Sequence, residues 1–69
     1  MDFSYAIKEV RYKLHLTQQQ LAEALSVNFT TINRWENGHS VPSKLALKSF
    51  YDFCENNFIN ISALTKDNM

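Results

Sequence analysis

The sequence holds one glycine and one proline in 69 residues, and this scarcity of turn-forming residues limits the possible folds most strongly. Sandwiches and barrels of short strands need many tight turns, which glycine and proline commonly supply. Helices need fewer such breaks. Hydrophobic residues make up 45% of the chain and charged residues 20%, which is a globular composition rather than a disordered one. Because a chain of this length supports one domain, a single all-α domain over residues 1–69 is predicted.

Apolar residues three or four positions apart predict a first helix over residues 3–14, with Phe3, Ile7, Val10 and Leu14 on one face. The next helix has its own start signal. Its N-cap is Thr17, which together with the glutamine three residues later forms a capping box.

The second helix is short, because Ser26, Val27 and Asn28 interrupt it. Asn28 is a suitable N-cap for a third helix through Glu36, and Gly38 supplies the left-handed residue that ends it. Pro42 and Ser43 introduce a fourth helix. Its apolar residues at helical spacing are Leu47, Phe50, Tyr51, Cys54 and Phe58.

The end of the fourth helix is predicted at Asn56 and Asn57. The tail holds Ile59, Ile61 and Leu64, and it either adds a short fifth helix or docks as an extended segment.

A stripe of apolar residues in this part of the chain exceeds what one helix needs to cover a small core. It is either a dimer face or the completion of the core by the tail, and its members are Phe50, Tyr51, Phe53, Phe58 and Ile61.

The charges balance, with seven Lys and Arg against seven Asp and Glu, whereas a basic chain is expected of a nucleic-acid binder. Residues 1–48 carry six basic and four acidic groups, so a slight positive excess lies in that part. Cys54 is the only cysteine, the first residues do not resemble a signal peptide, and no apolar run reaches the roughly 20 residues of a membrane span. A cytoplasmic protein without a membrane segment is predicted.

Residues 17–37 have the arrangement of a helix-turn-helix, in which two short helices pack at a steep angle across a turn of about three residues. A small residue is needed where the helices approach, and Ala22 provides it. Apolar anchors, Leu21, Leu25, Val27, Ile32 and Trp35, lock the crossing. One face of the second of these helices stays exposed, and its width suits the major groove of DNA.

The segments LTQQQLAEALSV at residues 16–27 and TINRWENG at residues 31–38, followed by Pro42, resemble the Xre/Cro repressor family. The resemblance covers about residues 7–54. It implies a compact four- to five-helix bundle of the lambda-repressor type with the third helix as recognition helix. It also implies sequence-specific binding of double-stranded DNA, usually by a homodimer on a two-fold operator.

The resemblance also assigns roles to individual positions. Residues at its base-facing positions are Phe29, Thr30, Asn33 and Arg34. Residues expected at phosphates are Gln18, Asn28 and Asn37, to which we add Thr17 at the start of its helix and Lys44 near the exit of the recognition helix. The resemblance also implies that Gln18 braces the recognition helix. Arg11 and Glu36 match a pair that forms a structural salt bridge.

Several of these positions have a second interpretation. Arg34 could pair with a neighbour such as Glu23, Asn33 could be a plain exposed helix residue, and Phe29 could be a partly buried staple for the third helix. In addition, Ser26 replaces the usual turn glycine of the family, so a positive φ there would be unfavourable.

The predicted function is that of a DNA-binding transcriptional regulator, most often a repressor. The alternative is a helix-turn-helix scaffold for protein contact, such as an antitoxin-like partner, or the targeting domain of a larger protein. Catalysis is not predicted, and neither a cofactor nor a metal is, because His15 and His39 have no cysteine or carboxylate at metal-ligand spacing.

Overall fold

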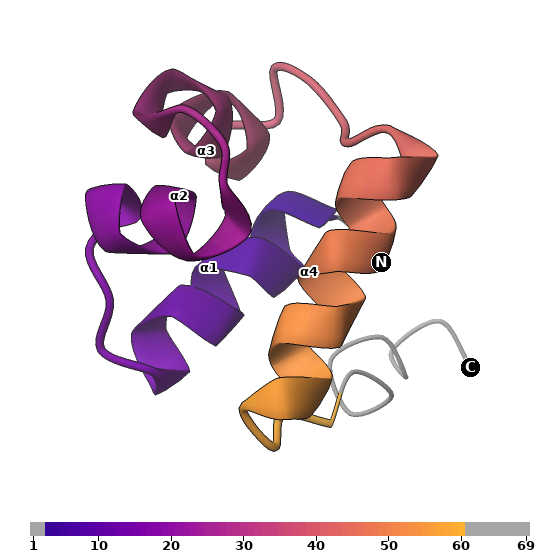
Figure 1. Ribbon diagram of the computed structural model, residues 1–69. Coiled ribbons are helices and arrows are strands. Elements are labelled where there is room, and N and C mark those ends of the chain that lie inside the picture. Colours follow the sequence, from indigo (N-terminus) through magenta and orange to yellow (C-terminus); the bar gives the residue numbers. More distant parts are fainter. Residues whose placement is uncertain (1–2, 61–69) are drawn as a thin grey trace.

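The computed structural model describes residues 3–60, which form four helices and no strand. The helices are α1 (Phe3–Lys13), α2 (Gln18–Leu25), α3 (Phe29–Glu36) and α4 (Lys44–Asn56) (Figure 1). The all-α prediction is therefore confirmed, although the first helix ends one residue earlier than predicted. The proposed fifth helix or extended tail falls largely beyond residue 60, outside the described residues.

The core is built from all four helices. α3 packs on both α2 and α1, and α4 packs against α2. The largest fully buried side chains are Ile7, Val10, Leu21, Ile32, Phe50 and Cys54. Phe3 of α1 joins this helix to α3 and α4. The centroid of its ring lies 5.6 Å from that of Trp35 and 5.1 Å from that of Phe50, both in edge-on contacts.

The starts of α2 and α4 are fixed by side-chain caps. Thr17 Oγ1 accepts from the backbone N–H of Gln20 at 3.0 Å, and Gln20 Oε1 accepts from the N–H of Thr17 at 2.8 Å, which confirms the capping box. Ser43 Oγ accepts from the N–H of Ala46 at 3.2 Å. Asn28 has the extended backbone of an N-cap, but its side chain makes no capping hydrogen bond.

All four helices end in the same way. A residue in the left-handed conformation lies one or two positions after each helix. Its N–H group and the N–H group of the next residue donate to carbonyl oxygens in the last turn of the helix, as in a Schellman motif. At the end of α2, for example, Ser26 donates to the carbonyl of Glu23 at 3.2 Å and Val27 to that of Ala22 at 2.9 Å. The left-handed residues and their φ angles are His15 (57°), Ser26 (59°), Gly38 (73°) and Phe58 (61°).

Phe58→Gly is expected to raise the free energy of unfolding by about 1 kcal/mol, because an L residue in the left-handed region is strained by roughly 1–2 kcal/mol, partly offset by the greater freedom of an unfolded glycine. The Phe58 ring is 96% exposed, so its removal sacrifices little packing. Phe58→Ala is the matched control, since it removes the ring and keeps the strain. Urea denaturation measures both variants, and equal stability of the two would contradict the explanation.

The apolar stripe predicted in the C-terminal part divides between core and surface. Phe50 is buried and Phe53 packs against the core, whereas Tyr51 is 44% exposed and Phe58 almost fully exposed. Ile59 also packs against the core, and Ile61 lies outside the described residues. The core therefore takes only part of the stripe.

Cys54 lies at the centre of the core, and burial raises the pKa of its thiol to about 11, because the thiolate would be desolvated. We expect thiol reagents at pH 8 to label Cys54 only as fast as the native protein opens. Labelling rates over a urea series measure this. Rapid labelling of native protein, at the rate of the urea-unfolded chain, would contradict the buried position.

Candidate nucleic-acid interface

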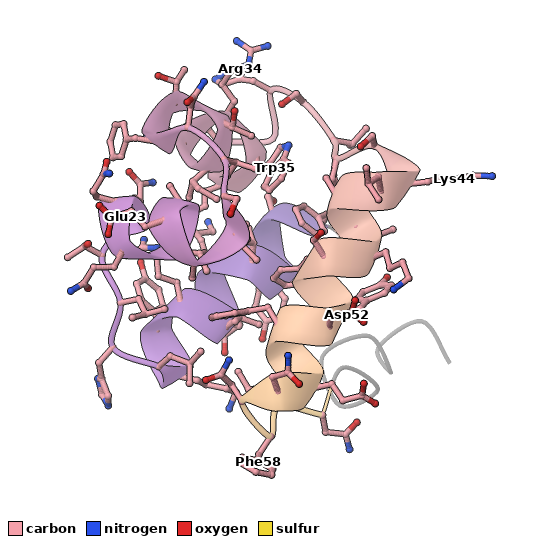
Figure 2. The ribbon with its side chains drawn as sticks, viewed as in Figure 1. Glu23, Arg34, Trp35, Lys44, Asp52 and Phe58 are labelled. Carbon is pink, nitrogen blue, oxygen red and sulfur yellow. The ribbon has the colours of Figure 1, made fainter. Side chains whose placement is uncertain are left out.

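The candidate interface is the outward face of α3. Ile32 and Trp35 point into the core, being fully buried and 5% exposed respectively. The four side chains expected to read bases lie on the remaining surface of the same helix. Phe29, Thr30 and Arg34 are exposed, and Asn33 is half-buried. In Figure 2, Arg34 extends from α3 into solvent, whereas Trp35 lies between α3 and α4.

Phe29 is not the staple of α3. A hydrophobic staple joins the residue before the N-cap to the fourth residue of the helix, and those positions belong to Val27 and Ile32. Val27 packs against the core cluster that contains Ile32. The ring of Phe29 is 46% exposed at the first position of α3.

Arg34 does not pair with Glu23. Among the described residues the ion pairs are those of Arg11 with Glu36 and of Lys48 with Asp52. The Glu23 carboxylate accepts instead from Gln19 Nε2 at 3.2 Å on its own helix. The guanidinium of Arg34 is thus left available at the surface.

Arg11 and Glu36 form a two-pronged ion pair that joins α1 to the end of α3. Arg11 Nε lies 2.6 Å from Glu36 Oε2, and Nη2 lies 3.0 Å from Oε1. Arg11 Nη1 also donates to the carbonyl of Leu16 at 3.1 Å. The hydrogen bond from Glu36 raises the pKa of Arg11, against a smaller opposing effect of burial. Among residues 3–60, Glu36 is the one charged residue that is buried, at 6% exposure.

Gln18 connects this ion pair to Asn33 of α3. Its Nε2 donates to Glu36 Oε1 at 3.0 Å, and its Oε1 accepts from Asn33 Nδ2 at 3.4 Å. Asn37 then donates through Nδ2 to the Asn33 carbonyl at 2.9 Å and to Asn33 Oδ1 at 3.2 Å. The bracing of α3 by Gln18 that the resemblance implies is made through Glu36 and Asn33. That Asn33 is linked to Gln18, and also to Asn37, was not predicted. The i, i+4 spacing of the two asparagines was the available signal for the second link.

The residues expected at phosphates differ in what they leave available. Thr17, Asn28 and Lys44 are exposed, and Lys44 extends from the first turn of α4 (Figure 2). Gln18 is half-buried and keeps one amide hydrogen beyond the one given to Glu36. Asn37 is exposed, but its amide already donates to two oxygens of Asn33.

No group of three or more His, Cys, Asp and Glu side chains in residues 3–60 is placed to hold a metal ion. No helix in that range is long and apolar enough to cross a membrane.

Comparison with known proteins identifies the class to which this geometry belongs. Residues 7–50, which contain all of α2 and α3, match the family described as helix-turn-helix. The chain belongs to the Xre-type helix-turn-helix family.

Three relatives resemble most of the chain. It is 40% identical over 53 residues to the HTH-type transcriptional activator BcrR of Enterococcus faecalis, covering 77% of this chain and 26% of that protein. It is 40% identical over 57 residues to the type II methyltransferase M1.ScrFI of Lactococcus lactis subsp. cremoris, covering 78% and 15%. It is 44% identical over 55 residues to the type II methyltransferase M.SsoII of Shigella sonnei, covering 75% and 14%.

The chain therefore spans only a small part of the length of these curated relatives. No solved structure gives a significant match.

Proposed function

We propose that the protein is a cytoplasmic transcriptional regulator that inserts α3 into the major groove of double-stranded DNA and reads its sequence there. It acts as a homodimer on a two-fold operator and represses by occupying that operator. The observation that carries this proposal is the division of α3 into two faces. The inner face is fixed to α1 and α2 through buried Ile32, Trp35 and Glu36, and the outer face presents aromatic, hydroxyl, amide and guanidinium groups.

The proposed base readers suit the edges of bases in the major groove. Arg34 is unpaired among the described residues and can donate to both acceptors of a guanine, and Asn33 suits adenine. The exposed ring of Phe29 can contact a thymine methyl group, and the Thr30 hydroxyl can donate or accept. The position of Phe29 and Thr30 at the N-terminus of α3 supports the proposal, because recognition helices read bases near their N-termini.

The proposed phosphate contacts surround this face. The Thr17 hydroxyl and the second amide hydrogen of Gln18 can donate from the start of α2. Asn28 and Lys44 contribute from the residue before α3 and from the first turn of α4. Because the Asn37 amide is used on Asn33, we assign Asn37 to the support of Asn33 rather than to a phosphate.

Lys44→Gln is expected to weaken DNA binding by a similar factor for every DNA sequence, since it removes one phosphate contact. It should also reduce the slope of log binding constant against log salt concentration by about one unit. The measurement is the dissociation constant at four salt concentrations for specific and random duplexes. Lys48→Gln is the control, because Lys48 lies on α4 and pairs with Asp52 at 3.0 Å. A slope equal in the Lys44 variant and the unaltered protein would remove Lys44 from the interface.

The proposed face can be mapped by titrating ¹⁵N-labelled protein with a 20-base-pair random duplex at low salt. We expect the largest changes in backbone amide NMR chemical shift at the N-termini of α2 and α3 and at Lys44. Shifts confined to the C-terminal half of α4, or no shifts at all, would contradict binding through α3.

A second candidate function is the DNA-targeting part of a longer protein. Two of the relatives are type II methyltransferases, of which the matched segment covers 15% and 14%. Sequencing of the native gene and the intact mass of its product would show whether a catalytic region accompanies these residues.

The net charge of zero is the observation that favours a scaffold for protein contact. The NMR titration excludes that function if the DNA-induced chemical-shift changes lie on α3.

A further inference from the structure

Five polar side chains form a chain of hydrogen bonds that runs in one direction, from Asn37 on the surface to the buried Glu36. Each amide donates to the next residue inward: Asn37 to Asn33, Asn33 to Gln18, and Gln18 to Glu36. Arg11 donates to Glu36 from the opposite side. The chain therefore converges on one carboxylate, which is almost completely removed from solvent.

The carboxylate fixes the direction of the whole chain. A side-chain amide can exchange its oxygen and nitrogen by a half-turn about its last bond, so an isolated asparagine offers either order of donor and acceptor. An ionised carboxylate only accepts, so Gln18 must turn its NH2 group toward Glu36 and its oxygen toward Asn33. Asn33 must then turn its NH2 group toward Gln18, which leaves its oxygen for Asn37.

The remaining hydrogen-bonding capacity of Asn33 matches one base. An amide has two donor hydrogens and can accept two hydrogen bonds. Asn33 uses one donor on Gln18 and one acceptor position on Asn37, so one donor and one acceptor position remain on this half-buried side chain. Adenine offers one acceptor and one donor in the major groove. Guanine offers two acceptors, while cytosine offers only a donor and thymine only an acceptor among hydrogen-bonding groups, so each leaves one Asn33 group unmatched.

We propose that Glu36, acting through Gln18, commits Asn33 to reading adenine, so that a buried residue without DNA contact determines specificity at one base pair. This inference rests on the proposed function, because it requires that α3 enter the major groove. Glu36 and Gln18 are positioning residues in this account, and Asn33 is the reader.

The test starts from the duplex that the unaltered protein selects and measures the relative affinity for all four bases at each position. Asn33→Ala identifies the position that Asn33 reads, as the one where preference is lost. We expect that position to be adenine, with a preference of roughly 5- to 150-fold, the range for a bidentate contact. Replacing this adenine by 7-deazaadenine, which lacks the N7 acceptor, should remove most of the preference of the unaltered protein.

Glu36→Gln keeps the shape of the side chain but can both donate and accept, so it releases the direction of the chain. It should flatten the preference at the adenine position and leave the position read by Arg34 unchanged. Glu55→Gln, the same chemical change on the exposed face of α4, is the control and should alter neither position. If Glu36→Gln does not fold, Gln18→Met cuts the chain between Glu36 and Asn33 and should flatten the same position.

The outcomes separate this inference from the proposed function. Selection of no sequence by folded protein would overturn both. A selected site whose preferences are unaffected by Asn33→Ala, or whose Asn33 position is not adenine, would overturn the inference alone. If the folded Glu36→Gln protein keeps the full preference for adenine, the role of Glu36 is overturned. If Glu36→Gln does not fold, full adenine preference in Gln18→Met has the same meaning.

Discussion

Glu36→Ala is expected to lower the free energy of unfolding by about 3–5 kcal/mol, the largest effect of any single substitution considered for this protein. The ion pair with Arg11 is mostly withdrawn from water, with 15% of the Arg11 side chain and 5% of the Glu36 side chain exposed. Removing the carboxylate leaves the guanidinium partly buried and without its partner, and it also takes away the acceptor of Gln18. The destabilisation comes from the groups left behind more than from the attraction lost.

A loss of this size is comparable with the whole stability of a small domain, so the measurement is urea unfolding in the presence of a stabilising osmolyte. Asp52→Ala is the matched control, since it breaks an exposed ion pair with Lys48 and should cost at most about 1 kcal/mol. The double substitution Arg11→Met with Glu36→Leu should be more stable than Glu36→Ala alone. Equal effects of Glu36→Ala and Asp52→Ala would contradict a structural role for the buried pair.

Arg34→Ala is expected to weaken specific DNA binding by about 1–3 kcal/mol and to relax the preference at one base pair. The reason is geometric, because a guanidinium can donate to both acceptors of a guanine at once. Arg34→Lys is the control that separates geometry from charge. It keeps the positive charge, so binding to random duplexes should change little, while the base preference should fall as in Arg34→Ala. An unchanged preference in Arg34→Ala would remove Arg34 from the reading face.

Much of the fold could be predicted because the signals are local in the sequence. The capping box at Thr17 and the left-handed Gly38 each depend on residue types within a few positions. The left-handed conformations of His15 and Phe58 could not be predicted from residue type. A bulky residue such as Phe rarely adopts that region, and a His adopts it more often than most residues but still in a minority of cases. They adopt it because Leu16 and Ile59, one residue further on, pack against the core and the chain must turn to place them there.

The site shows the same contrast between local and long-range contacts. The outward position of Arg34 follows from helical spacing once Ile32 and Trp35 are assigned to the core. The contact of Gln18 with Asn33 could not be read from spacing, because the residues lie on different helices, 15 positions apart. It depends on how α2 and α3 cross and on Glu36, whose carboxylate is oriented by α1. The hydrogen-bond chain thus required three helices to be placed together.

Selection from a random double-stranded DNA library at physiological salt, followed by sequencing of the bound fraction, tests the central claim most directly. We predict enrichment of a two-fold site whose half-sites lie about one helical turn apart, with the α3 variants losing preference at separate positions. Failure to enrich any sequence, from protein shown to be folded by its thermal unfolding transition, would contradict sequence-specific DNA binding through α3.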